Sequence, residues 1–199
     1  MTLRSTRRAS VLALAGAAAA FPWVARAHRE APADMTRVAS ADIAALPAVA
    51  LRSMTGEART LRDALNVDEP LILNFVFTTC STTCSLQTAV LAQVQREEKA
   101  RGRPLRLASI TIDPDNDTPE QLRRFASQFG VAPGWQFYTG RFDDLLRVQK
   151  HFDVYRGSKV SHPPVLLMRW HQRAPWMRVE GFPKPAEIQA LVDKLPHGG

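Results

Sequence analysis

Cysteines, runs of basic residues and long apolar stretches are all scarce in this sequence of 199 residues. Its two cysteines, Cys80 and Cys84, are too few for a scaffold held together by many disulfides. Its 10 glycines and 14 prolines follow no repeat, which excludes a collagen-like structure, and no apolar stretch reaches the roughly 20 residues that span a bilayer. With 45% hydrophobic and 23% charged residues, the composition is typical of a globular protein.

The excess of positive charge does not indicate nucleic-acid binding. The formal net charge is +7, but the first 27 residues carry four arginines and no acidic residue, so removing them leaves +3. That remainder is spread along the chain and forms no basic stripe of the kind that binds phosphates. We therefore expect no nucleic-acid partner.

The first 27 residues have the three parts of an export signal. Arg7 and Arg8 precede the apolar stretch 11–21, and a small-residue cleavage pattern ends at Ala27. Residues 6–12 resemble a bacterial twin-arginine signal. We expect residues 1–27 to direct the chain to the periplasm and to lie outside the fold. Contact with the membrane is then expected only through a partner, or through a signal that stays uncleaved as a tether.

The rest of the chain is predicted to form one domain behind a linker. Residues 28–48 are rich in alanine, proline and charge without a sustained period, which predicts a flexible linker, and the domain covers 49–199. A predicted hairpin over 49–61 comes first, followed by the apolar run Leu71–Phe77, typical of a central strand.

Beyond that run, predicted strands and helices alternate until two last strands follow each other without a helix between them. The expected helices begin near Leu86, Pro119, Phe142 and Ile188, and the expected strands cover 105–112, 136–139, 165–170 and 176–180. This order predicts an α/β, thioredoxin-like fold: a central mixed sheet flanked by helices, with an N-terminal hairpin extension.

Both cysteines fall where the apolar strand gives way to a helix. The N–H groups of a first helical turn favour a thiolate over a thiol, so Cys80 and Cys84 are expected to be reactive. Their spacing of four places the side chains one helical turn apart on the same face, where they can close a disulfide or hold one soft metal ion. A bridge across so short a loop would constrain little of the unfolded chain, which argues against a purely structural role.

Two thiolates leave a coordination sphere incomplete, so we looked for a third ligand among the five histidines. His162 comes just before a predicted strand, in the loop that a thioredoxin-like fold sets beside the cysteine junction. From spacing alone a plain loop role for His162 remains open. His151, His171 and His197 are expected to be solvated, and His28 would lie in the linker. Asp113 and Asp117 are interpreted as turn and cap residues.

With Asn74–Cys80 ahead of Cys84, the segment Ser109–Glu120 and a late histidine, the chain resembles the Sco/SenC family over about residues 50–195. Members are membrane-tethered or exported thioredoxin-like proteins that bind copper through a C-x-x-x-C pair and one distant histidine, and help assemble the dinuclear copper centre of cytochrome c oxidase. The resemblance implies that Cys80, Cys84 and His162 bind Cu(I) or Cu(II). The implied partner is the copper-bearing subunit of cytochrome c oxidase or another periplasmic copper protein.

The sequence departs from the family pattern around both parts of the implied site. Ser81 and Ser85 stand where proline commonly follows the cysteines, and Ser161 stands where aspartate commonly precedes the histidine. Pro163 and Pro164 resemble the proline that thioredoxins set in cis opposite their cysteines.

Two main functions follow from these residues. The first is a periplasmic copper chaperone that holds copper on Cys80, Cys84 and His162. The second is an enzyme, a thiol-disulfide oxidoreductase in which Cys80 attacks and Cys84 resolves. Peroxiredoxin-type activity is disfavoured because the Pro-x-x-x-Thr-x-x-Cys pattern is missing, and a binding module with an inert disulfide is the remaining alternative.

Overall fold

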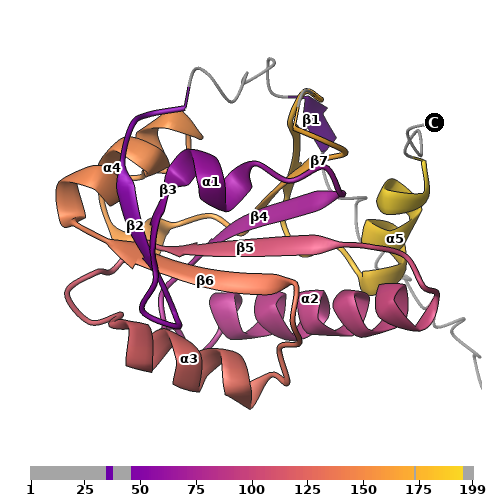
Figure 1. Cartoon of the computed structure of the whole chain (residues 1–199), viewed down its shortest axis with the longest axis horizontal. Coiled ribbons are helices and arrows are strands. Elements are labelled where there is room, and N and C mark those ends of the chain that lie inside the picture. Colours follow the sequence, from indigo (N-terminus) through magenta and orange to yellow (C-terminus); the bar gives the residue numbers. More distant parts are fainter. Residues whose placement is uncertain (1–34, 38–45, 173, 195–199) are drawn as a thin grey trace, which may run out of the picture. The chain divides into compact units, whose positions relative to one another are not determined.

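A mixed sheet forms the centre of the computed structural model, which describes residues 35–37, 46–172 and 174–194 (Figure 1). These residues belong to one compact unit, 32–199. Within them the sheet has eight strands in the order β1-β8-β7-β4-β5-β6-β2-β3. The strands are β1 (Met35–Arg37), β2 (Ala50–Ser53), β3 (Ala58–Thr60), β4 (Leu71–Val76), β5 (Arg106–Thr111), β6 (Trp135–Gly140), β7 (Val165–Arg169) and β8 (Met177–Glu180).

Helices cover both faces of this sheet. They are α1 (Leu61–Leu65), α2 (Thr83–Ala100), α3 (Pro119–Gln128), α4 (Phe142–His151), the short 3-10 helix η2 (Lys159–Ser161) and α5 (Pro185–Asp193). Helices α2 and α3 lie on one face and α1 and α4 on the other (Figure 1). Helix α5 packs beside α2, where Arg101 donates to Gln189 at 3.3 Å. The α/β, thioredoxin-like architecture predicted from the order of elements is confirmed.

The pairing of the central strands determines which loops meet. β4 runs parallel to β5, with Val76 opposite Thr111, and antiparallel to β7, with Asn74 opposite Leu166. The end of β4, the end of β5 and the beginning of β7 therefore share one edge of the sheet. The β4–α2 loop, the β5–α3 loop and the segment before β7 all meet at that edge, which we call the cysteine edge.

β4 is central because its sequence tolerates burial on both faces. All six residues of Leu71–Val76 are buried, as expected for a strand covered by helices on each side. The one polar member, Asn74, is satisfied: its amide donates to Gln87 at 3.1 Å, and its carbonyl oxygen accepts from Ser109 at 2.6 Å. Ser109 in turn accepts from the indole N–H of Trp135 at 2.9 Å. A polar chain therefore links three strands to α2 inside the core.

Most predicted element boundaries agree with the structure. The side chain of Thr118 caps α3 by accepting from the N–H of Gln121, with Pro119 in the first turn, as the sequence indicates. The hairpin over 49–61 is present as β2 and β3. Helix α2 begins at Thr83, three residues earlier than expected, so Cys84 lies inside it.

Three features differ from the expectations or extend them. The short helix α1 follows the hairpin and was not predicted. Within the expected linker, Met35–Arg37 forms strand β1 on β8 and Leu46 is buried, while residues 28–34 and 38–45 lie outside the described residues, as does the expected signal 1–27. No cis peptide bond occurs in the described part of the chain, so the interpretation of Pro163 and Pro164 as a thioredoxin-like cis proline is wrong.

Candidate metal centre

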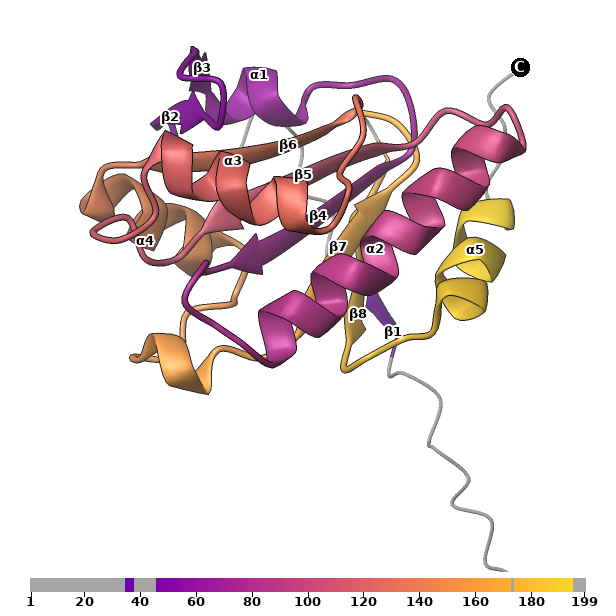
Figure 2. The same cartoon turned by 90° about the horizontal axis from the view of Figure 1, so that it is seen from below.

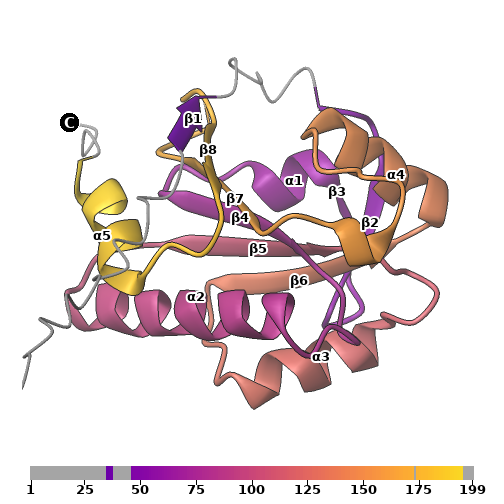
Figure 3. The ribbon, with the colours of Figure 1, turned by 180° about the vertical axis from the view of Figure 1, so that it is seen from behind.

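The loop that carries Cys80 is held to the neighbouring strand by one carboxylate. Asp117, which is fully buried, accepts from both the backbone N–H and the hydroxyl of Thr78, at 3.1 Å and 2.5 Å, and also from the hydroxyl of Thr111. Thr78 directly follows the apolar run Leu71–Phe77 and lies two residues before Cys80. Asp117 therefore fixes the start of the β4–α2 loop against the end of β5. Figure 3 shows the course of this loop from the end of β4 to the first turn of α2.

The two cysteines are free thiols held close together by the first turn of α2. The backbone N–H of Cys84 donates to the sulfur of Cys80 at 3.3 Å, and the hydroxyl of Ser85 donates to the carbonyl oxygen of Cys80 at 3.0 Å. Cys80 is half-buried, whereas Cys84 is only 2% exposed. Solvent can therefore reach Cys80, whereas Cys84 is almost completely covered by the protein.

This arrangement makes the two thiols unequal acids. Partial burial acts to raise the pKa of the Cys80 thiol, but the N–H groups and side chains of Cys84 and Thr82 together outweigh it, and the pKa is lowered overall. Burial raises the pKa of the Cys84 thiol to about 12, and the nearby Cys80 sulfur and Asp117 carboxylate add to the rise. Cys80 is the thiol that ionises first.

His162 lies at the same edge but its ring is packed inward. It directly follows η2, which sits at the same end of the sheet as the first turn of α2 (Figure 2). Its imidazole contacts the ring of Phe75 edge-on, with centroids 6.1 Å apart, and Phe75 in turn contacts Phe152. The Nδ1 atom is buried without a hydrogen-bond partner.

The surroundings of His162 favour its neutral form. Burial lowers the pKa of the imidazole, the positive charges of Arg156 and Arg178 lower it further, and the backbone at Val154 and Phe75 acts in the opposite direction. A neutral imidazole with an unpaired nitrogen has the protonation state that metal binding requires.

The structure brings Cys80 and Cys84 together but does not complete a three-ligand set. Within residues 46–172 and 174–194, no three histidine, cysteine, aspartate or glutamate side chains are gathered closely enough to hold a metal ion. Of the other histidines, His151 ends α4 with its ring against Phe152, far along the chain from the cysteine loop. His28 and His197 lie outside the described residues.

The sequence predicted a turn residue at Asp113 and a cap residue at Asp117. The second prediction is wrong, because Thr118 caps α3. The distant partners of both aspartates were not predicted. Asp113 does shape the turn, since its carbonyl accepts from the N–H of Asn116 at 3.1 Å. Its carboxylate also forms an ion pair with Lys159 of η2, with 2.5 Å between Oδ2 and Nζ. Only the pairing of β5 with β4, and of β4 with β7, reveals these partners, because they are 39 and 46 residues apart in the sequence.

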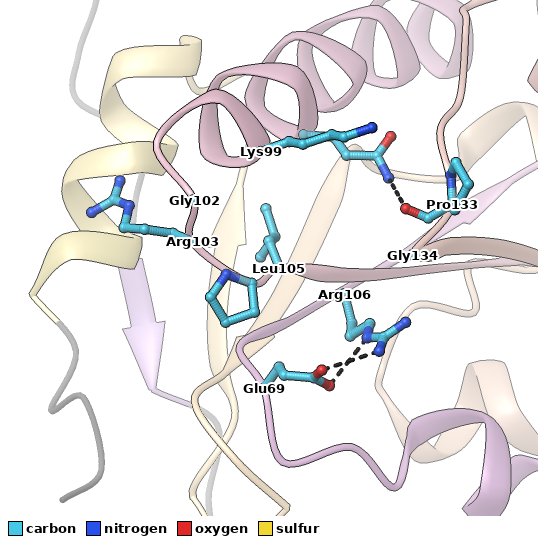
Figure 4. Close-up of a pocket in the computed structure, with 10 residues that line it drawn as sticks. Glu69, Lys99, Gly102, Arg103, Leu105, Arg106, Pro133 and Gly134 are labelled. Carbon is cyan, nitrogen blue, oxygen red and sulfur yellow. Dashed lines mark hydrogen bonds and ion pairs between the residues drawn. The ribbon is translucent and has the colours of Figure 1, made fainter.

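A hollow at the opposite end of the sheet from the cysteines has different chemistry. A cavity of about 440 Å³ opens between the end of α2 and the start of β5 and is lined by no cysteine or histidine (Figure 4). Two of its charged residues pair with each other, since Arg106 makes two hydrogen bonds to Glu69, at 3.1 and 3.0 Å. It is therefore no candidate for soft-metal or thiol chemistry.

In the described part of the chain, no helix combines the length and apolar character needed to cross a membrane.

Comparison with known proteins places this geometry in a family. The family model described as SCO1/SenC matches residues 50–168, more than half of the chain. The SCO1 protein homolog of Bacillus subtilis is 37% identical over 73 residues, which is 36% of this chain and 38% of that protein. Across the curated relatives, the matched region spans between 38% and 61% of their own length.

Solved structures agree on the fold. The structure of BsSco, described as a member of the Sco family of cytochrome c oxidase assembly proteins with a disulfide switch, superposes with a TM-score of 0.65 at 22% identity, covering 79% of this chain and 94% of that one. Arabidopsis thaliana ScoI with copper bound gives 0.62 at 19% identity, covering 74% and 95%. With the match to residues 50–168 and the cysteine pair at the β4–α2 junction, the chain belongs to the SCO1/SenC family.

Proposed function

We propose that this protein is an exported copper chaperone that binds copper with Cys80, Cys84 and His162 and delivers it to the dinuclear copper site of cytochrome c oxidase. The observation that carries the proposal is the meeting, at one edge of the sheet, of two free thiols and a neutral imidazole whose Nδ1 is unpaired. Membership of a family with copper-bound and oxidase-assembly members supports the cargo and the recipient.

The cysteine pair suits a soft cation that must be both held and released. Thiolates favour Cu(I) over harder metals, and the half-buried Cys80 gives an incoming or outgoing ion access to the site. Cys84, with its pKa near 12, keeps its proton in the metal-free protein, so copper binding must release that proton. Affinity is therefore expected to rise with pH.

His162 supplies the third ligand after a change of position. Its ring packs against Phe75, and among the described residues no three potential ligands are gathered around one point. Loss of that contact and a turn of the His162 side chain toward Cys80 would bring Nδ1 or Nε2 to the thiolates. The buried Nδ1 atom has no hydrogen-bond partner in the packed position of the ring.

Export to the periplasm is part of the proposal. It is supported by the arginine-led apolar segment and small-residue pattern of residues 1–27. In that compartment the cysteines meet oxidants, so the copper-binding form must be kept reduced by a partner. Fractionation of cells, with detection of the chain in the periplasmic extract, tests this point.

The test is an anaerobic Cu(I) titration of the reduced protein against a competing chromophoric chelator. We expect one copper per chain, loss of that copper in Cys80→Ser and Cys84→Ser, and weaker binding in His162→Ala. His151→Ala is the matched control, because the ring of His151 also packs edge-on against a phenylalanine, Phe152, but lies outside the proposed site. This variant should bind copper like the wild type. Equal affinity and unchanged spectra for His162→Ala would remove His162 from the ligand set.

A second candidate function is thiol-disulfide exchange, which the unequal acidity of the thiols favours. The Cys80 thiolate would attack a partner disulfide, forming a mixed disulfide and releasing one partner thiolate. Cys84, once deprotonated, would attack the Cys80 sulfur and release the second partner thiolate. The partner gains two electrons and this chain ends as the Cys80–Cys84 disulfide. Fast turnover of a model disulfide by His162→Ala protein would favour this enzyme over the chaperone.

A further inference from the structure

A single ion pair joins the segment before His162 to the other side of the cysteine edge. Lys159, the first residue of η2, places its Nζ 2.5 Å from Oδ2 of Asp113 and 5.8 Å from the centroid of the Phe77 ring. Phe77 directly follows β4 and lies three residues before Cys80. The lysine side chain therefore crosses the end of β4, from the β7 side to the end of β5.

The acidic partner is a fixed anchor. Asp113 is only 7% exposed, and its carboxylate accepts from the side-chain amide of Asn116 at 3.1 and 3.0 Å. The backbone N–H of Asp113 donates to the hydroxyl of Thr111 at 2.9 Å, and Thr111 is itself tied to Asp117. Asp113 is thus built into the same network that holds the start of the cysteine loop.

The segment that the lysine carries has no comparable anchor of its own. The hydrogen bonds that the backbone N–H groups of this segment donate are local: those of Val160 and Ser161 go to Ser158, and that of His162 goes to Lys159. All four side chains of 158–161 are exposed, and Val160 is 82% exposed. Among the described contacts of this short helix, those of Lys159 with Asp113 and Phe77 are the ones that reach a distant part of the chain.

We infer that Lys159 is a positioning residue for copper binding: its ion pair with Asp113 holds the segment 158–161 over the end of β4 and so keeps His162 within reach of Cys80. This inference rests on the proposed function. Without the pair, the segment samples more positions, and bringing His162 to the thiolates costs more conformational entropy. The cysteines themselves do not depend on it, because Cys80 and Cys84 are held by α2.

The first experiment uses the metal-free protein and hydrogen exchange. In Lys159→Met, which keeps the length of the side chain but not its charge, the backbone amides of Ser161 and His162 should exchange several-fold faster than in the wild type. Lys159→Arg should restore protection. Lys150→Met is the matched control, since the ammonium of Lys150 lies over the ring of Tyr155, 5.5 Å from its centroid, and not beside Asp113. This variant should leave both amides unchanged. Unchanged exchange in Lys159→Met overturns the inference.

The second experiment is a double-mutant cycle on Cu(I) affinity. Lys159→Met is expected to weaken binding about 10-fold, the size typical of groups that orient a metal ligand. In the His162→Ala background the same change should have no effect, because the residue acts through His162. A loss that persists in that background, or no loss in the presence of His162, overturns the inference. If His162→Ala itself binds copper like the wild type, the ligand set of the proposed function fails and the positioning role fails with it.

Discussion

The backbone N–H of Cys84 donates to the sulfur of Cys80 at 3.3 Å, so the second cysteine of the pair stabilises the thiolate of the first. Helix α2 begins at Thr83, and the N–H groups of its first turn have no acceptor within the helix. The N–H of Cys84 can therefore donate to the Cys80 sulfur. Cys84 itself, in contrast, belongs to the buried core and is 2% exposed. A spacing of four residues at a strand–helix junction thus gives one reactive and one protected thiol.

This asymmetry predicts different reactivity toward an alkylating agent. In Cys84→Ser protein, the rate at which Cys80 is alkylated should reach half its maximum at a lower pH than for an ordinary thiol. The reason is that the backbone N–H that stabilises the Cys80 thiolate remains after the substitution. In Cys80→Ser protein, Cys84 should react slowly and require a much higher pH, in keeping with its burial and its pKa near 12. Iodoacetamide rates measured across pH by mass spectrometry test this. Equal rates for the two single-cysteine proteins would contradict the structure.

The buried polar chain from Trp135 to Asn74 predicts a stability loss at Ser109. Ser109→Ala leaves the indole N–H of Trp135 and the carbonyl oxygen of Asn74 without partners in the core, at a cost of about 1–3 kcal/mol in the free energy of unfolding. Ser127→Ala is the control: it removes an exposed hydroxyl of α3 that donates to the backbone carbonyl of Arg124. It should lower the free energy of unfolding by less than about 0.5 kcal/mol. Urea unfolding of both variants checks the difference, and similar losses would refute it.

Local patterns in the sequence predicted what depends on local physics. The run Leu71–Phe77 predicted a central strand because burial on both faces requires continuous apolar residues, and Thr118 with Pro119 predicted the start of α3 because capping involves only neighbours. The same reasoning identified the cysteine pair at the strand–helix junction. These features need no knowledge of the rest of the fold.

The contacts that organise the site depend on strand order and were not predictable in this way. Nothing near Lys159 in the sequence indicates Asp113, and Asn74 within its apolar run gives no sign of Ser109 or Gln87. The inward packing of His162 on Phe75 likewise follows from the antiparallel register of β4 and β7. A resemblance in sequence can point to His162 as a ligand, but it does not state against which side chains the ring packs.

Asp117 is expected to be essential for the fixed start of the cysteine loop. Asp117→Ala removes the acceptor for the N–H and hydroxyl of Thr78 and for the hydroxyl of Thr111, and should cost about 2–4 kcal/mol. Asp115→Ala, an exposed neighbour in the same loop, should cost less than about 0.5 kcal/mol. Denaturant unfolding measures both losses. The amide of Thr78 should also exchange faster with solvent in Asp117→Ala, and retained protection there would show that another group holds the loop.

The buried carboxyl of Asp117 also predicts a pH dependence of stability. Burial raises the pKa of Asp117 above its ordinary value of 3.8, although the donors of Thr111 and Thr78 oppose the rise. A raised pKa means that the folded chain keeps the proton at a pH where the unfolded chain has lost it. The contribution of this group to stability is therefore complete below pH 3.8 and is lost as the pH rises through the folded pKa.

Asp117→Asn cannot titrate at this position, so it isolates that contribution. The free energy of unfolding of the wild type minus that of Asp117→Asn should be largest in acid, fall as the pH rises, and level off above the folded pKa. Urea unfolding of both proteins from about pH 3.5 to about pH 7 gives this difference, in which the titration of the other carboxyl groups cancels. A difference that grows with pH would mean that the Thr78 and Thr111 donors outweigh burial and that the carboxylate is the form that the fold prefers.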